Sequence, residues 1–221
     1  MAVTRPELGP TLPGALRERF GIPPVVTLAV AGAIAVAAVT AILIALTGPT
    51  APGEKVVHED PPVFNMLHPP DVLKDVEPHA GELMRFEGRR AGLEVAVVVR
   101  PLELPRFDGD VTHGLLPVEA DRFVEAAKRA MPGLELSQEG RARVNNAVGY
   151  EVGYERVTAS ERFLGRDVLL VPDDPEEGRG QVLLSLRQRK DSGAKLTPPE
   201  RNLAYVARKA YRSFRFGTAR G

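Results

Sequence analysis

The sequence predicts an α+β protein with one transmembrane helix and an extracytoplasmic domain, a mainly antiparallel sheet flanked by two helices. Three observations lead to this fold class. The 23 residues of Val25–Thr47 carry no charge. Beyond about residue 63, short runs alternate apolar with polar residues, as half-buried strands do. Two further segments, at 118–131 and 199–214, place their apolar residues on one helical face.

The segment Val25–Thr47 is long enough to cross a membrane. A helix of this length spans roughly 35 Å, against a hydrocarbon layer of ~30 Å. Pro23 and Pro24 suit its first turn, and Gly48 with Pro49 suits its end. A cleaved signal peptide is an alternative, but its apolar core would span only about 7–15 residues. A buried core helix, the other alternative, is seldom apolar on all sides.

Charges beside this segment predict its orientation in the plasma membrane. Arg17 and Arg19 precede it, whereas Glu54, Glu59 and Asp60 follow it. Basic flanks stay in the cytoplasm, so we expect the N-terminus inside and the C-terminal domain outside. The expected organisation is a cytoplasmic Pro-rich tail at 1–24, the membrane helix at 25–47, an extended linker at 48–62, the domain at 63–217 and a short tail at 218–221.

Small residues recur at every fourth position of the predicted membrane helix. Such a ridge lets two helix backbones approach closely in lipid. We therefore expect a contact surface for self-association or for another membrane protein, although an Ala-rich segment can produce this spacing by chance. The ridge consists of Ala29, Ala33, Ala37, Ala41 and Ala45.

The outer domain is predicted to contain three pairs of strands joined by short connections. Short connections make neighbouring strands antiparallel, and a helix is needed on each apolar face of the sheet to bury it. The expected pairs are Leu83–Glu87 with Leu93–Leu104, Gly140–Val144 with Val148–Arg156, and Arg162–Val171 with Val182–Arg189.

Two helices complete the predicted domain. The first, Val118–Met131, is stopped by the Pro-Gly pair that follows it. The second, Pro199–Phe214, begins after a T-x-x-E capping box made by Thr197 and Glu200.

The last helix is also expected to present a basic face. No acidic residue follows Glu200 in the chain. A basic face outside the membrane could bind anionic lipid headgroups or an acidic partner. The alternative is a solvated surface whose cations lie favourably near a helix C-terminus. The residues that can share this face are Arg201, Arg208, Arg212 and Arg215.

No motif in the sequence predicts catalysis, a metal or a cofactor. The 29 basic and 29 acidic residues cancel, which argues against nucleic acid as a partner. The absence of cysteine excludes disulfides, thiol nucleophiles and a lipobox anchor. The four histidines lack the spacing of zinc ligands. Carboxylates at 173–177 are of the kind that calcium prefers, but Pro175 among them favours a solvated turn.

Three short segments carry a resemblance to a known family. They are Phe64–Pro70, Asn145–Val152 and Ser213–Phe216. Together they resemble the PsbP-like family, the extrinsic photosystem subunit and its relatives in bacterial envelopes and lipoproteins. The family's Trp after the opening proline is absent, and Asp71–Leu73 stands there. The resemblance implies a PsbP-like sandwich over 63–217 that acts as a scaffold, and it transfers no active site. The excess of Arg over Lys indicates a high-GC bacterium such as an actinobacterium.

The expected function is a membrane-anchored, non-catalytic interaction or assembly module of the cell envelope. Its partners would be the bilayer, through residues 25–47, and a membrane or envelope protein. The alternative is a small-ligand or lipid-binding module with a cavity between sheet and helix, lined by Phe86, Tyr150 or Tyr154. An envelope enzyme is the third hypothesis, and it would require carboxylates and a histidine clustered in a cleft.

Overall fold

The computed structural model describes residues 53–174, 179–191 and 195–218. These residues belong to one compact unit, Ala51–Gly221. The predicted membrane helix and its alanine ridge, at positions 29, 33, 37, 41 and 45, lie outside the described residues, as does the N-terminal tail. Among the residues described, no helix is both long enough and apolar enough to cross a membrane.

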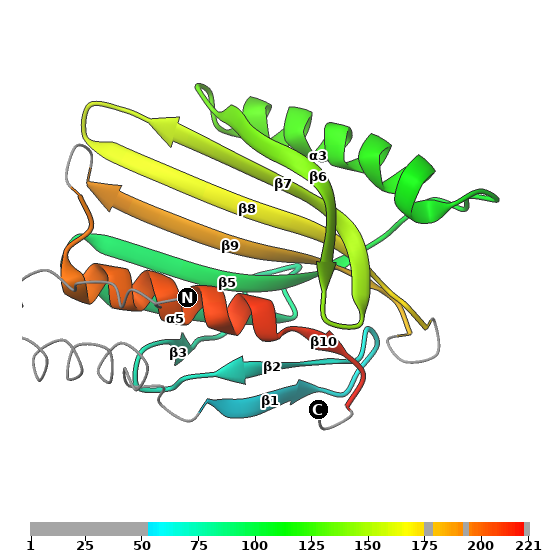
Figure 1. Cartoon of the computed structure of the whole chain (residues 1–221), viewed down its shortest axis with the longest axis horizontal. Coiled ribbons are helices and arrows are strands. Elements are labelled where there is room, and N and C mark those ends of the chain that lie inside the picture. Colours follow the sequence, from blue (N-terminus) through cyan, green and yellow to red (C-terminus); the bar gives the residue numbers. More distant parts are fainter. Residues whose placement is uncertain (1–52, 175–178, 192–194, 219–221) are drawn as a thin grey trace, which may run out of the picture. The chain divides into compact units, whose positions relative to one another are not determined.

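The larger of two sheets has its strands in the order β3-β4-β5-β9-β8-β7-β6 (Figure 1). Each strand is antiparallel to its neighbours, which confirms the prediction of a mainly antiparallel sheet. The three predicted pairs are present as β4–β5, β6–β7 and β8–β9. The bounds are β3 (Lys74–Asp75), β4 (Met84–Arg90), β5 (Leu93–Leu102), β6 (Glu135–Val144), β7 (Ala147–Val157), β8 (Glu161–Pro172) and β9 (Gln181–Asp191).

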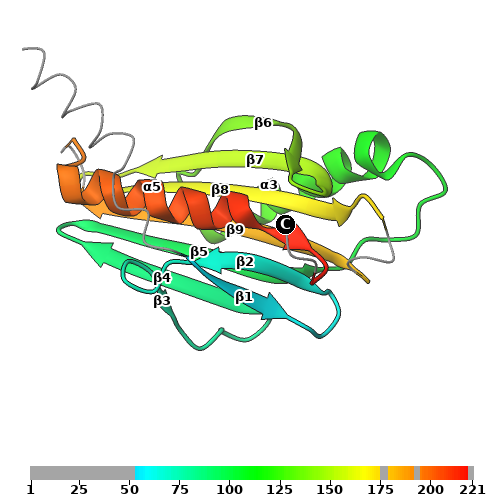
Figure 2. The same cartoon turned by 60° about the horizontal axis from the view of Figure 1, so that its bottom comes forward.

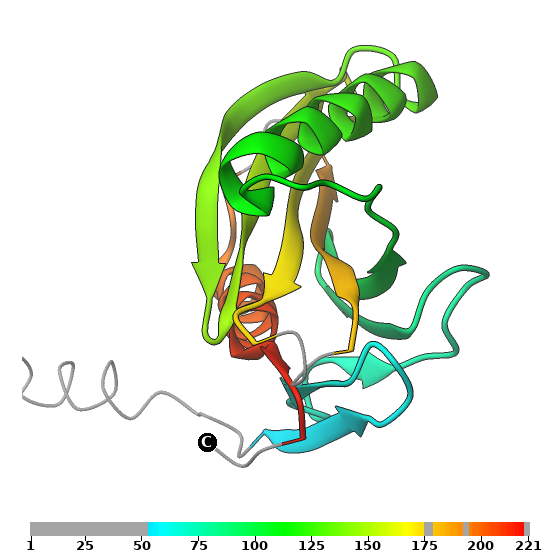
Figure 3. The ribbon, with the colours of Figure 1, turned by 90° about the vertical axis from the view of Figure 1, so that its right-hand side faces the viewer.

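Two α-helices cover opposite faces of this sheet, as Figures 2 and 3 show. They are α3 (Leu116–Ala130), which follows a π-helical turn η1 (Val111–Leu115), and α5 (Pro198–Ser213). Two successive residues of β9 point to opposite faces of the sheet. Leu184 packs in the core beneath α5, and Leu183 packs in the core beneath α3. Successive strand residues point to opposite faces, so the prediction of one helix per face is confirmed.

Glu200 fixes the start of α5 against the larger sheet. Its carboxylate accepts hydrogen bonds from Lys190 Nζ at 2.6 Å, from Thr197 N at 2.6 Å and from Gly92 N at 3.1 Å. The Lys190 and Thr197 hydrogen bonds lower the pKa of this carboxyl to about 2, against the effect of burial. The predicted capping box is therefore confirmed, and the same carboxylate ties the helix to β9.

A second, smaller sheet has the order β1-β2-β10 and packs into the same core as α5. Its strands are β1 (Glu54–His58), β2 (Phe64–His68) and β10 (Arg215–Phe216). The prediction of an extended linker at 48–62 was wrong for residues 54–58. These residues form β1, which pairs with β2 along its whole length. Backbone pairing to a distant strand stabilises this segment, and its Pro-rich, charged composition gives no sign of such a partner.

The two-residue turn between β6 and β7 holds the C-terminal end of α5. Asn145 has a φ of 51°, as a tight hairpin turn requires, and its Nδ2 donates to Phe214 O at 2.7 Å. Asn146 Oδ1 accepts from Phe216 N at 3.0 Å, while its Nδ2 donates to Phe216 O at 3.1 Å. Two of the segments that resemble the PsbP-like family are thus in direct contact.

We expect Asn146→Ala to lower the free energy of unfolding by about 2 kcal/mol. The substitution removes two hydrogen bonds and leaves the backbone N–H and C=O of Phe216 without these partners. Chemical denaturation measures the change. The matched control is Asn202→Ala at an exposed position of α5, which should stay within about 0.5 kcal/mol of the unsubstituted chain. Equal losses in the two variants would contradict the prediction.

Candidate functional site

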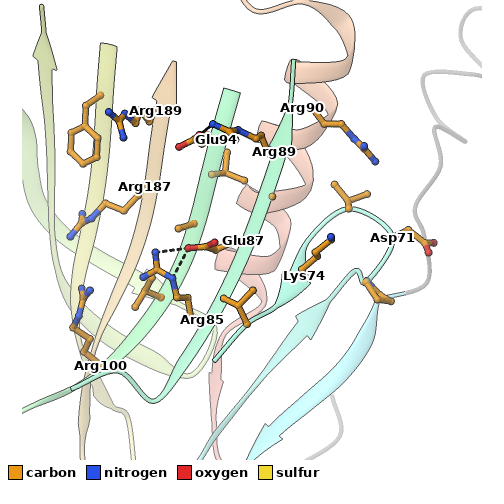
Figure 4. A pocket seen from close by; sticks show the side chains of 18 of the residues that line it. Asp71, Lys74, Arg85, Glu87, Arg89, Arg90, Glu94, Arg100, Arg187 and Arg189 are labelled. Carbon is orange, nitrogen blue, oxygen red and sulfur yellow. Dashed lines mark hydrogen bonds and ion pairs between the residues drawn. The ribbon is translucent and has the colours of Figure 1, made fainter. Parts of the chain in front are cut away.

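Helix α3 leaves part of its face of the larger sheet uncovered. The core beneath α3 is formed with residues of β7, β8 and β9, such as Val152, Leu169 and Leu183. Beside it, the same face forms a groove of about 790 Å³ over β4, β5 and β9 (Figure 4). Ala96 and Val98 of β5 line its floor. This volume lies within the range of ligand-binding clefts, about 300–1,000 Å³.

Basic side chains dominate the lining of the groove. Seven Lys or Arg residues line it, against three Asp or Glu. Four of the arginines come from three neighbouring strands: Arg85 from β4, Arg100 from β5, and Arg187 with Arg189 from β9 (Figure 4). They share one face because alternate residues of paired strands point to the same side.

Glu82 holds two of these arginines in place. Its carboxylate is 2% exposed and accepts hydrogen bonds from Arg85 Nη1 at 3.1 Å and from Arg100 Nη2 at 2.5 Å. Burial raises the pKa of Glu82, but the hydrogen bond from His79 N and the two guanidinium groups outweigh it and keep this pKa below its ordinary value. Glu82 is therefore a charged anchor that fixes two guanidinium groups at one end of the groove.

Arg187 is held by a buried polar cluster beneath the groove. Its Nη1 donates to Oδ2 of the fully buried Asp167 at 2.7 Å. The Tyr154 hydroxyl donates to the same oxygen and accepts a hydrogen bond from Arg187, whose guanidinium lies 5.2 Å from the centre of the Tyr154 ring. The ring itself packs over Gly165 of β8. Arg187 thus has one fixed orientation toward the groove.

The positive charge near Arg187 is not fully neutralised by the acidic group of the cluster. Burial raises the pKa of Asp167 to about 7, with the Ser185 hydroxyl and the charge of Arg100 acting in the opposite direction. Burial, followed by repulsion from Arg100, lowers the pKa of Arg187 to about 10. An anion between Arg100 and Arg187 would stabilise both charges. Guanidinium groups bind carboxylates and phosphates through paired donors, so the groove is suited to an anionic group.

Two further arginines lie at the exposed edge of the groove. Arg189 pairs with Glu161 of β8, and Arg89 pairs with Glu94 of β5. Their side chains are 62% and 77% exposed. A guanidinium group has five N–H donors, and these pairs leave donors that can reach a bound partner.

The residues predicted to form a basic face occupy two different elements. Arg201, Arg208 and Arg212 are exposed on α5, on the side of the sheet opposite the groove. The placement of Arg215 on the helical face was wrong, because α5 ends at Ser213 and Arg215 is half-buried in β10. Phe214 leaves the helical region with φ −47° and ψ 137°, and β10 then pairs with β2.

The aromatic residues considered for a ligand cavity do not line the groove. Phe86 is fully buried in the core beneath α5, and Tyr154 belongs to the Asp167 cluster. In the parts of the chain described, no group of three or more His, Asp or Glu residues could hold a metal ion.

The four groove arginines were not predicted from the sequence. The signal that could have found them is a charged residue at every second position of a strand, as in Arg85-x-Glu87-x-Arg89 and Arg187-x-Arg189. All four lie on the side of the sheet on which α3 leaves the groove open.

No protein-family model and no curated protein matches this chain. Similar solved structures include that of cyanobacterial PsbP (CyanoP) from Synechocystis sp. PCC 6803, with a TM-score of 0.48 and 13% identity over 76% of this chain and 94% of that one. LpqN, involved in cell envelope biogenesis of Mycobacterium tuberculosis, has a TM-score of 0.45 and 13% identity over 74% and 91%. A protein from Bacteroides thetaiotaomicron has a TM-score of 0.40 and 10% identity over 75% and 48%.

Proposed function

We propose that this chain is a membrane-tethered, non-catalytic interaction module of the cell envelope, and that the groove binds an acidic segment of an envelope protein. The observation that carries the proposal is the convergence of arginines from β4, β5 and β9 over one open face of the sheet. The predicted helix at 25–47 supplies the tether.

The arginine side chains of the groove are held in place by the protein's own acidic residues, without a bound partner. Glu82 and Asp167 lie behind Arg85, Arg100 and Arg187 and fix the direction of their guanidinium groups. Side chains that are already fixed lose little conformational entropy on binding, so more of the interaction energy appears as affinity. The small apolar floor lets a chain segment lie close to β5 between these donors.

The edge of the groove favours a protein partner over an enclosed small ligand. Small-molecule sites bury about 70–90% of the ligand surface. Here Arg89 and Arg189 stand largely exposed beside the groove. A polar, hydrated rim around a less polar centre is the organisation of protein–protein contact surfaces.

Site-specific photocrosslinking in intact membranes tests the proposal. A photoreactive amino acid replaces Asp71, which lines the groove at an exposed position, in the full-length chain. We expect a protein adduct whose yield falls about tenfold in an Arg100→Gln/Arg189→Gln variant, since charge-assisted contacts are lost. The matched control, Arg122→Gln/Arg129→Gln, removes the same charge from exposed positions of α3 and should keep the adduct.

Three results would contradict the proposal in distinguishable ways. An adduct of unchanged yield in the groove variant would exclude the groove as the binding site. An adduct with the mass of a lipid or small molecule would replace the protein partner with a ligand-binding function. Loss of the adduct in the α3 control as well would indicate an effect of net charge alone.

A further inference from the structure

Helix α5 carries an exposed basic and aromatic stripe, most of which faces away from the sheet. At its edge, Arg208 lines a small hollow together with Gln188 of β9. The residues of the stripe recur at the spacing of one helical face, and their neighbours on the other side of α5 are buried. We call this surface the α5 stripe; it consists of Arg201, Tyr205, Arg208, Lys209 and Arg212.

The cations of the α5 stripe are not neutralised by neighbouring acids. In the part of the chain that the structure describes, none of its arginines or its lysine forms an ion pair, whereas Arg85, Arg100 and Arg187 in the groove are all paired. Tyr205 is 56% exposed, and Lys209 Nζ lies 5.1 Å from the centre of its ring. Exposed Tyr and basic residues together are typical of surfaces that meet lipid headgroups.

Only a short connection separates the predicted membrane helix from the first strand of the domain. The predicted helix ends at Thr47 and β1 begins at Glu54, so six residues, 48–53, join them. Fully extended, this connection spans at most about 25 Å. Glu54 pairs with His68 in the register of β1 and β2.

The same strands bring the connection beside the C-terminal end of α5. The neighbouring residue of β2, Leu67, donates its N–H to Ser213 Oγ at 2.8 Å. Ser213 is the last residue of α5, so the connection joins the domain close to Arg212 and Lys209. If residues 25–47 span the membrane, a connection of this length allows the α5 stripe to reach the membrane surface.

We propose that the α5 stripe docks on anionic phospholipid headgroups of the membrane in which the chain is anchored. This inference depends on the predicted membrane helix and not on the groove. Docking through α5 turns the opposite face of the larger sheet away from the bilayer. The groove on that face then opens toward the envelope, where a protein partner can reach it.

Fluorescence quenching in lipid nanodiscs tests the inference on the full-length chain. The chain has no cysteine, so Asn202→Cys gives one labelling site beside the α5 stripe without changing it. Ala126→Cys, exposed on α3, gives the matched site across the sheet. With a quencher on the lipid headgroups, we expect quenching at position 202 in discs that contain phosphatidylglycerol, little in pure phosphatidylcholine, and little at position 126 in either.

Charge removal gives the second part of the test. The triple variant Arg208→Gln/Lys209→Gln/Arg212→Gln should weaken docking on the order of 100-fold, since each basic residue near an anionic surface contributes separately. The control Arg122→Gln/Lys128→Gln/Arg129→Gln removes the same charge from α3 and should leave docking unchanged. Added salt should reduce quenching in the unsubstituted chain, which tests the electrostatic attraction without a substitution.

Several outcomes would overturn docking on lipid. These are equal quenching in the two lipid compositions, equal quenching at positions 202 and 126, or full quenching in the triple variant or at high salt. The discs contain no envelope protein besides this chain, so absence of quenching at position 202 would also overturn it and leave the α5 stripe to a protein partner.

Discussion

Arg187→Met is expected to destabilise the domain by about 3 kcal/mol at pH 8 and by about 2 kcal/mol at pH 5. The variant leaves Asp167 buried without its cationic partner, and breaking a buried ion pair in this way is costly. Burial already raises the pKa of Asp167 to about 7, and loss of Arg187 raises it further. Because the folded state then binds the proton more tightly than the unfolded state, stability falls as the pH rises from about 4 to 8.

Chemical denaturation at the two pH values measures this difference. Arg189→Met is the matched control, since it removes the next arginine on the same face of β9 from an exposed position. It should cost less than about 1 kcal/mol at either pH. Asp167→Asn removes the ionisable group, so adding Arg187→Met to it should cost the same at pH 5 and at pH 8. Equal losses for Arg187→Met at pH 5 and pH 8 would contradict the role of Asp167.

Gly165→Ala is expected to destabilise the domain by about 3 kcal/mol, a large effect for one added methyl group. A Cβ at this position of β8 would lie 2.1 Å from Cε2 of Tyr154. Tyr154 pairs directly with Gly165 across β7 and β8, and its hydroxyl is bound to Asp167 and Arg187. The ring therefore has to leave its position, and the strain of overpacking adds to the loss of these hydrogen bonds.

A double-mutant cycle with Tyr154→Leu isolates the steric effect of Gly165→Ala. The smaller side chain leaves space for the new methyl group, so the double variant should cost clearly less than the sum of the two single variants. Unfolding free energies of the four proteins complete the cycle. Strict additivity would show that the ring of Tyr154 does not determine the need for glycine at this position.

Local patterns in the sequence predicted much of the sheet and both helices correctly. The alternation in Leu93–Leu104 and the Asn145–Asn146 turn depend on neighbouring residues, and they correspond to β5 and the β6–β7 hairpin. The capping box of Thr197 and Glu200 is equally local. Strand β1 was not predicted because it is stabilised by hydrogen bonds to β2, and its own Pro-rich, charged segment gives no sign of this partner. Arg215 was misplaced because the break at Phe214 precedes a pairing with β2, which no helical periodicity reveals.

The groove could not be predicted because it is formed by the β4–β5 hairpin together with β9, which lies far away in the sequence. Arg85 and Arg187 meet the same groove only through the pairing of β4 with β5 and of β5 with β9. The sequence shows that each is on the polar side of its strand. The sequence does not show that α3 covers only the other end of that face. The position of α3 depends on the packing of Leu116 and Val124 over the β7–β8 region.

The smaller sheet has a consequence for the order of folding. Its central strand, β2, forms near the start of the domain, but its partner β10 holds residues 215 and 216, near the end of the chain. The loop between them includes the whole larger sheet, and closing such a loop is slow because its entropy must be lost before the contact forms. The Asn145–Asn146 turn meets the same last residues. The domain is therefore completed only after residues 215 and 216 have been synthesised.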